Sequence, residues 1–284
     1  MKFRKITSQS NHNPKRLNSR RRSFLWQTGA AVSAVFASAA AGMARPGAQA
    51  NTTLQDQVER LSGRLGILED ENAIRELHRY YGYYLDKGMH REIVELFADA
   101  GAVVFNGGIF MGKEQGVRRL YVDYFGRGFT GGRHGPVHGF LLDHTQTQNA
   151  VEIAADRNTA IARFHCLMQA RAPVDPDSPH LDMARLQGQD IVQWWEGGIY
   201  ENTYVKHGSV WKIQRLEYRP VWQADYAQGR AYGRPGYIRP FARTWPEDPI
   251  GPDRLIPPVP EQPGGLNVVS FQQPHPVTEK LWKT

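Results

Sequence analysis

Tyrosines on one helix face, followed by a single acid, are the side chains of this sequence best suited to acid–base chemistry. The apolar positions of the predicted helix are spaced three, four and three residues apart and therefore share a face: Ile74, Leu77, Tyr81 and Tyr84. The helix breaks at Lys87-Gly88, directly after Asp86. A cavity lined by Tyr81 and Tyr84, with the Asp86 carboxylate at its rim, would suit proton transfer on a hydrophobic, hydroxylated molecule.

Histidine could complete such a site, because an imidazole accepts or donates a proton near neutral pH. A carboxylate beside the imidazole holds its tautomer and raises its basicity. We therefore expect Asp86 to pair with His144 or with His165, both of which fall on predicted strands. The sequence patterns leave the choice between the two histidines open.

A metal site is the competing interpretation of the histidines. His134, His138 and His144, together with Asp143, offer enough ligands for a zinc ion. Glycines and Pro136 interrupt the run, so no helix presents the first two histidines on one face. The sequence also has no dinucleotide fingerprint, phosphate loop or nucleophile-elbow serine. We therefore expect neither a metal nor a cofactor.

The elements that must position these side chains are helices first and strands afterwards, which favours an α+β fold over a parallel sheet. A strand at Ala102–Asn106 and a helix at Val117–Phe125 precede a segment with five glycines, Gly126–Gly135, which we interpret as a lid. Longer strands follow, the last of them turning back at residues 207–209: His144–Ile153, Thr159–Arg171, Arg185–Trp195 and Ile199–Arg219.

Apolar and polar side chains alternate along Thr159–Arg171, which is typical of a half-buried antiparallel strand. One face is uniformly apolar: Ala160, Ala162, Phe164, Cys166 and Met168. His165 lies on the opposite, polar face. On the later strands Trp194 and Trp195 must point to opposite sides, so one of them lines the cavity. We expect Trp194 and Tyr200 to contact the substrate.

The first 50 residues account for the basic character of the chain and carry an export pattern. They hold nine of the 35 Lys/Arg residues and no acid, which leaves 26 basic against 28 acidic residues in the rest. Arg21-Arg22-Ser23-Phe24-Leu25 resembles a twin-arginine motif. An Ala-rich apolar run and Ala48-Gln49-Ala50, a signal-cleavage pattern, follow it. We expect residues 1–50 to be a signal peptide and the mature protein to be periplasmic, with no nucleic-acid partner and no membrane span.

Two further segments flank the predicted domain. Apolar residues at heptad spacing mark residues 51–70: Leu54, Val58, Leu61, Leu65 and Leu68. This stretch is either an amphipathic helix lying on the domain or a short oligomerisation helix. Residues 223–284 are rich in proline and aromatic residues, which indicates an extended arm wrapped over the domain or over a neighbouring subunit. We expect a homo-oligomer, dimer or trimer, and no intrachain disulfide because Cys166 is the only cysteine.

The order of elements between residues 71 and 222 resembles the SnoaL-like branch of the nuclear transport factor 2-like superfamily. The resemblance rests on helix–Asp–Gly–helix, on Leu96-Phe97-Ala98-Asp99 with its following strand, and on Tyr204-Val205 and Val210-Trp211-Lys212-Ile213 near the end. It implies an α+β fold in which a cone-shaped, curved antiparallel sheet packs on about three helices. An N-terminal helix and the Pro-rich arm would lie outside this unit.

The resemblance also implies roles for single residues. Asp86 matches the acid that ends the first helix of scytalone dehydratase, and Tyr81 matches an aromatic residue on the cavity side. Phe105, followed by Asn106, stands where that enzyme has a tyrosine. His138 or His144 matches a histidine before the third β segment, and His165 matches one in the next strand. We therefore expect catalytic roles for Asp86, His144, His165 and Tyr81, and substrate contacts from a second group: Tyr84, Phe105, Asn106, His138, Trp194 and Tyr200.

The family includes dehydratases, ketosteroid isomerase-like enzymes and β subunits of ring-hydroxylating dioxygenases, as well as exported lyases that release formaldehyde from lignin-derived diaryl compounds. An aromatic lining and an export signal favour a cofactor-independent lyase that acts on a hydroxylated aromatic compound and releases formaldehyde or water. A ketosteroid isomerase-like proton-transfer enzyme is one alternative. A periplasmic ligand-binding or assembly module without catalysis is the other.

Overall fold

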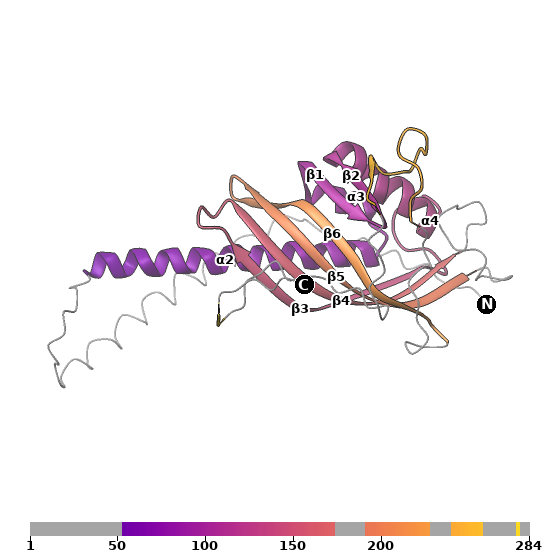
Figure 1. The fold of residues 1–284 in the computed structure, drawn as a ribbon. Helices are drawn as coiled ribbons and strands as arrows, with labels where there is room; N and C mark the ends of the chain where they lie inside the picture. The colour runs from indigo at the N-terminus through magenta and orange to yellow at the C-terminus, as the bar shows by residue number, and fades with distance from the viewer. Residues whose placement is uncertain (1–52, 174–190, 228–239, 258–276, 279–284) are drawn as a thin grey trace, which may run out of the picture. The chain divides into compact units, whose positions relative to one another are not determined.

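The computed structural model describes residues 53–173, 191–227, 240–257 and 277–278 (Figure 1). The chain divides into two units, Met1–Thr53 and Leu54–Thr284, and all described residues except Thr53 belong to the second. The predicted signal peptide therefore lies outside the described residues. Within the described part of the chain, no helix is both long enough and apolar enough to cross a membrane.

One continuous helix, α2 (Leu54–Asp86), joins the heptad-patterned stretch to the first helix of the domain. Its buried positions recur every three or four residues and form a face that packs on the sheet: Gly66, Asp70, Ile74, His78, Tyr81 and Leu85. The apolar pattern predicted Ile74 and Tyr81 on this face, whereas the buried polar residues Asp70 and His78 were not expected there. The helix ends at the predicted break, where Gly88 has a φ of 62°, a left-handed conformation that glycine adopts without strain.

The described strands form one sheet in the order β3-β4-β5-β6-β1-β2-β7 (Figure 1). The strands are β1 (Phe97–Phe105), β2 (Gly108–Met111), β3 (Leu141–Ile153), β4 (Thr159–Pro173), β5 (Ile191–His207), β6 (Val210–Asp225) and β7 (Arg254–Leu255). The α+β class and the curved sheet are as predicted. The sheet is not wholly antiparallel, however, because β1 pairs with β6 in parallel.

Strand β5 runs through the point where two separate strands were predicted. Gly197 and Gly198 form a register shift within β5 and do not end it. A Cβ atom at Gly197 would overlap the Trp222 indole, and one at Gly198 would overlap the Tyr218 ring. The two glycines therefore give room for aromatic side chains from β6 to lie across the strand. The first residues of the predicted strand, 185–190, lie outside the described residues.

Helices α3 (His90–Glu95), η1 (Gly112–Val117), η2 (Arg119–Phe125) and α4 (Gly126–Thr130) cover one end of the sheet. The segments η1 and η2 are π-helical. The first half of the predicted lid is thus helix α4, which ends at Gly131 with a φ of 59°. Phe129 of α4 is buried in the core, so these residues form a wall and not a loop.

Part of the Pro-rich arm packs on the domain of its own chain. The buried ring of Phe241 contacts the rings of Phe110 and Tyr124, and β7 pairs with β2. Arg119 fixes the returning segment, because it donates hydrogen bonds to the Gly251 carbonyl at 2.7 Å and to Asp253 at 2.6 Å. Residues 240–257 therefore back the aromatic core of this chain.

Candidate active site

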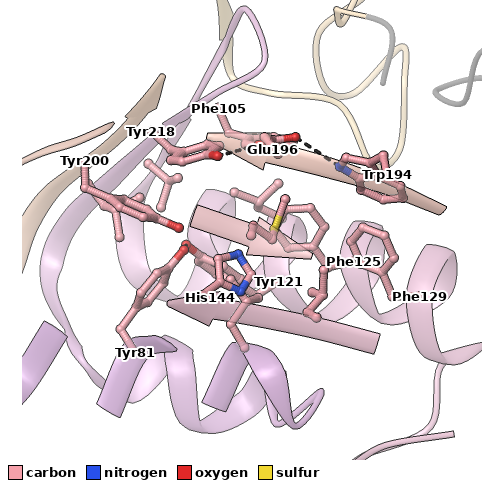
Figure 2. Close-up of a pocket in the computed structure, with 16 residues that line it drawn as sticks. Tyr81, Phe105, Tyr121, Phe125, Phe129, His144, Trp194, Glu196, Tyr200 and Tyr218 are labelled. Carbon is pink, nitrogen blue, oxygen red and sulfur yellow. Dashed lines mark hydrogen bonds between the residues drawn. The ribbon is translucent and has the colours of Figure 1, made fainter. Parts of the chain in front are cut away.

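An apolar cavity lies between the sheet and helices α2, η2 and α4; we call it the inner cavity (Figure 2). It has a volume of about 530 Å³, including its open mouth. Its lining is aromatic and aliphatic except for one histidine, one glutamate and the tyrosine hydroxyls: Tyr81, Leu85, Val103, Phe105, Leu120, Tyr121, Phe125, Phe129, Leu142, His144, Met168, Trp194, Glu196, Tyr200, Leu216 and Tyr218. Such a site would hold a hydrophobic molecule and offer few, well-defined polar contacts.

His144 of β3 is held by Asp86 at the end of α2. The His144 Nδ1 atom lies 2.7 Å from Asp86 Oδ1, and the His144 backbone N–H donates to the same oxygen at 3.0 Å. An ionised carboxylate accepts hydrogen bonds only, so Nδ1 carries the proton and Nε2 becomes the proton acceptor. The ring points into the inner cavity (Figure 2). This is the arrangement of a general base with an orienting acid.

Asp86 faces a second, polar pocket between α2 and the edge strand β3. This outer pocket is lined by side chains of α2 and β3, among them Arg75, Arg79 and Gln146. His144 is the one lining residue common to the outer pocket and the inner cavity. His144 therefore lies at the boundary between the apolar inner cavity and a polar pocket.

Glu196 of β5 is the second titratable group of the inner cavity, and its side chain is only 3 % exposed. Trp194 Nε1 donates to Glu196 Oε2 at 3.1 Å, Gln223 donates to the same oxygen, and the Tyr218 hydroxyl donates to Oε1 (Figure 2). Burial raises the pKa of Glu196 above its usual range, although these hydrogen bonds act in the opposite direction. A carboxyl group with a raised pKa is a candidate proton donor.

His144 and Glu196 belong to one row of paired residues across the sheet. His144 pairs with Met168 on β4, and Met168 pairs with Glu196 on β5. Residues paired across neighbouring strands point to the same face, and strands lie about 4.8 Å apart, so the two backbones are roughly 10 Å apart. The row places a candidate base and a candidate acid on either side of Met168, and all three residues line the inner cavity.

Three tyrosines of the inner cavity bring their hydroxyls together. Tyr121 Oη donates to Tyr81 Oη at 3.1 Å, and Tyr200 also hydrogen-bonds to Tyr81. Burial raises the pKa of Tyr81 to about 12, and the pKa values of Tyr121 and Tyr200 also rise. The three phenols stay neutral near pH 7. Because Tyr121 donates its proton to Tyr81, the hydroxyl of Tyr81 is the one of this pair that is able to donate to a substrate oxygen.

The family model described as a SnoaL-like domain matches residues 66–217, more than half of the chain. The protein is a member of the SnoaL-like family. The family belongs to the nuclear transport factor 2-like superfamily, as the sequence predicted. The match begins inside α2 and ends in β6, so it includes every lining residue of the inner cavity except Tyr218, and it leaves out the first part of α2 and the arm.

Solved structures similar to this SnoaL-like protein include a candidate scytalone dehydratase from Novosphingobium aromaticivorans. The two are 20 % identical, the match covers 62 % of this chain and 96 % of the other, and the TM-score is 0.43. A type 3 hexachlorocyclohexane dehydrochlorinase from Novosphingobium barchaimii is 17 % identical over 61 % of this chain and 97 % of the other, with a TM-score of 0.42. A comparison with curated proteins gives no match.

The structure brings five of the predicted site residues together around the inner cavity of this SnoaL-like protein: Tyr81, Phe105, His144, Trp194 and Tyr200. Asp86 contacts this set through His144. Trp195, the neighbour of Trp194, points away and stacks on Tyr226 with ring centroids 5.6 Å apart.

Four predicted residues do not line the inner cavity. His165 is exposed on the opposite face of β4, where its ring lies 3.2 Å from the Thr147 hydroxyl, so it is not available to Asp86. His138 is exposed in a turn, because the chain continues for several residues before β3 begins. Asn106 occupies the β1–β2 turn with a φ of 47°, and its carbonyl accepts from Phe241 N. Tyr84 packs against the outside of the core.

Glu196, Tyr121 and Tyr218 were not predicted as site residues. Glu196 stands two positions after Trp194 on the same strand, so the alternation of strand residues could have placed it on the cavity side. The glycine pair that follows Glu196 looked like the end of a strand and hid this signal. Within the described residues, no three His, Cys, Asp or Glu side chains are grouped so as to hold a metal ion.

Proposed function

We propose that this SnoaL-like protein is a cofactor-independent lyase that acts by acid–base catalysis on a hydroxylated aromatic compound. The observation that supports this most strongly is the row His144–Met168–Glu196 beneath an aromatic cavity. A lyase needs one group that takes a proton, another that protonates a leaving hydroxyl, and a chamber that excludes water. The presence of His144 and Glu196 in the inner cavity supports the first two roles, and its apolar lining supports the third.

In this proposal His144 is the base and Glu196 the acid. Asp86 holds the Nδ1 proton of His144, so Nε2 is able to accept a proton from the substrate. Burial favours the protonated form of Glu196, which makes the carboxyl group able to give a proton to a departing hydroxyl. Tyr81, whose oxygen accepts from Tyr121, would donate its own proton to a substrate oxygen.

Two reactions are consistent with these roles. In a dehydration, His144 takes a C–H proton, the C–H electrons form the double bond, and the benzylic hydroxyl leaves as water with the proton of Glu196. In a formaldehyde release, His144 takes the proton of a terminal hydroxyl, the O–H electrons form the carbonyl of formaldehyde, and the carbon–carbon bond breaks. The electrons of that bond then form the new alkene as the benzylic hydroxyl leaves as water with the proton of Glu196.

Lignin-derived diaryl compounds are the substrate class that we propose. The ring of Phe125 contacts those of Phe105 and Phe129, and these three rings line the inner cavity together with Trp194 (Figure 2). Aromatic side chains favour edge and offset contacts with other aromatic rings. A diaryl diol also carries both the benzylic and the terminal hydroxyl that the second reaction uses.

We also propose that the protein acts in the periplasm after twin-arginine export. The support is the order of Arg21-Arg22, the apolar run and Ala48-Gln49-Ala50. Replacement of both arginines by lysine should leave the protein in the cytoplasm in a cell fractionation. Unchanged delivery to the periplasm would contradict the proposed route.

The reaction is tested by incubating the protein with diaryl diols and simpler hydroxylated aromatics and measuring product masses. A loss of the mass of water by dehydration, or of formaldehyde together with water, is the expected result. A product of unchanged mass would indicate an isomerase. Saturable binding with no product from any compound would indicate a ligand-binding module, and either result would overturn the lyase proposal.

A further inference from the structure

The first half of α2 carries an exposed apolar stripe. Five side chains at heptad spacing are 50 to 78 % exposed, and we call them the leucine stripe: Leu54, Val58, Leu61, Leu65 and Leu68. A soluble monomer rarely exposes a contiguous apolar patch of more than a few hundred Å². Five large side chains in line therefore call for a partner surface.

The anchoring of α2 prevents the leucine stripe from turning toward its own domain. Asp70 accepts hydrogen bonds from Lys206 at 2.6 Å, from Arg157 at 2.7 Å and from Trp211 at 2.9 Å. Gly66 lies against the Arg157 side chain, with no room for a Cβ. At 3.6 residues per turn, Gly66 and Asp70 lie on the side of the helix opposite Leu61, Leu65 and Leu68. The stripe thus faces outward while the other side of the helix is fixed to the sheet.

We propose that the leucine stripe is a dimer interface that packs in parallel, in register, against the same stripe of a second copy of this chain. A heptad stripe is self-complementary, because each a or d residue inserts between residues of the same pattern on the partner helix. With Leu54, Leu61 and Leu68 at the d positions, Val58 and Leu65 occupy the a positions. Leucine at d together with a β-branched residue at a favours two-stranded coils.

Charges beside the leucine stripe select the parallel arrangement. Arg64 occupies a g position and Glu69 the e position of the next heptad. In a parallel pair these positions meet across the interface, so two Arg64–Glu69 ion pairs would form. In an antiparallel pair g positions meet g positions and e positions meet e positions, so Arg64 and Glu69 could not meet. The Arg64–Glu69 pairs therefore form only when the helices run in the same direction.

A short stripe is enough here because the helix is already formed. Two heptads of isolated peptide would be marginal in water, since helix nucleation is costly. Residues 54–68 belong instead to a 33-residue helix whose second half is buried against the sheet. Dimerisation would then cost little helix-forming entropy, and we expect a reversible dimer.

Sedimentation velocity of the full chain across a range of concentrations tests the interface. The wild type should dimerise, and the variant Leu61→Gln/Leu65→Gln should raise the dissociation constant at least about 100-fold, because each buried leucine is worth roughly a tenfold change or more. The matched control is Ile67→Gln, which removes an exposed apolar side chain on the same helix outside the stripe. Circular dichroism checks that all three proteins remain folded.

Two results would overturn the dimer proposal: a wild type that stays monomeric at every concentration, or an oligomer that survives the double leucine substitution. Substitutions that change the charges at positions 64 and 69 test whether the two helices run parallel. Glu69→Arg should weaken the dimer, and Arg64→Glu/Glu69→Arg should restore it, because the exchanged charges again meet in a parallel pair. Leu61→Cys should form an interchain disulfide readily, since residue 61 faces itself in a parallel pair. Failure of both restoration and crosslinking would contradict the parallel register.

Discussion

His144 and Glu196 lie two strands apart on the same face of the sheet, with Met168 paired to both. The two groups differ in their surroundings. Asp86 holds one ring nitrogen of His144 from the outer pocket, whereas Glu196 is buried among hydrogen-bond donors. These surroundings favour His144 as a proton acceptor and Glu196 as a proton donor, which is the combination expected of an acid–base pair.

Replacement of Asp86 by asparagine should lower kcat at least about 100-fold with a smaller effect on KM, because the amide no longer holds the His144 tautomer. His144→Gln should lower kcat by at least as much. Steady-state kinetics on the substrate found by the mass screen provide the measurement.

The matched control for these two variants is His165→Gln. This histidine is exposed on the opposite face of β4, so its loss should leave kcat within about twofold of the wild type, as surface substitutions usually do. Full activity of Asp86→Asn, or a large loss in His165→Gln, would exclude the proposed pairing.

Glu196→Gln should abolish the falling alkaline limb of the pH–kcat profile as well as lower kcat. The proposed acid works only when protonated, and burial raises its pKa, so wild-type activity should fall as pH rises through that raised value. The contribution of Glu196 to the free energy of unfolding should also decrease as pH rises. The protonated form is favoured in the folded protein, so stability decreases as pH rises from the ordinary value of 4.5 through the raised one. Glutamine removes both dependences.

A wild type whose kcat is flat across the alkaline range would argue against Glu196 as the acid. A substitution elsewhere in the lining of the inner cavity controls for effects that come only from a change in the shape of the cavity. Leu142→Val trims a lining side chain without adding or removing a titratable group. This variant should change KM while keeping the shape of the pH profile.

Much of the fold was predictable because strand and helix periodicities are local properties. The break after Asp86, the apolar face of β4 and the opposed pair Trp194-Trp195 all follow from spacing alone. The parallel pairing of β1 with β6 and the continuity of β5 do not. They depend on contacts between distant segments, such as Tyr218 lying over Gly198.

The site was harder to predict than the fold because register decides which side chains share a cavity. β3 has a register shift between Gln146 and Asn149, so alternation counted from one end of the strand fails at the other. In β4 no shift intervenes, and parity places His165 opposite Met168. The expected catalytic role of His165 came from the resemblance, although the alternation along β4 already placed this residue on the polar face. In the structure His165 is exposed on that face.

Acid should unfold the protein through His78. This imidazole is 1 % exposed and stacks on Phe164, and burial lowers its pKa to about 3. Nε2 donates to Gln146 Oε1 and the Asn202 amide donates to Nδ1, so the folded protein holds the neutral ring. Stability is therefore complete above the ordinary value of 6.5 and is lost as pH falls toward 3, by at most about 5 kcal/mol.

Urea denaturation from pH 7 to pH 3 measures this loss. His78→Gln should be less stable at pH 7 yet show a shallower decline, because it has no proton to take up on unfolding. The pKa of His90 is also lowered, to about 4, so part of the acid dependence should remain. An identical slope in the wild type and in His78→Gln would contradict the assignment.

Gly198→Ala should disturb both stability and the site. The new methyl group would overlap the Tyr218 ring, whose hydroxyl donates to Glu196. Overpacking of this kind typically costs about 1–3 kcal/mol. We therefore expect a lower denaturation midpoint together with a lower kcat. Gly63→Ala is the opposite case, since a Cβ at this position would meet no atom within 4 Å and alanine should stabilise an exposed helix position by roughly 0.5–1 kcal/mol.

Asp70 fixes α2 to the sheet, and we expect its removal to destabilise the protein more than the loss of any other polar side chain outside the inner cavity. Asp70 is 4 % exposed and joins one helix to three side chains: Arg157, Lys206 and Trp211. Although burial raises the pKa of Asp70, the hydrogen bonds from these donors outweigh it and lower the pKa below 3.8. Asp70→Ala would leave two cations without their partner, Lys206 largely buried and Arg157 less so, and should cost up to about 3–5 kcal/mol of unfolding free energy.

Denaturant unfolding of Asp70→Ala beside Glu76→Ala, an exposed acid on the same helix, isolates this contribution. The control should change the unfolding free energy by less than about 0.5 kcal/mol. Because Asp70 also fixes the outward orientation of the leucine stripe, its loss should weaken dimerisation without touching a stripe residue. Equal stabilities of the two variants would mean that the sheet holds α2 through its apolar face alone.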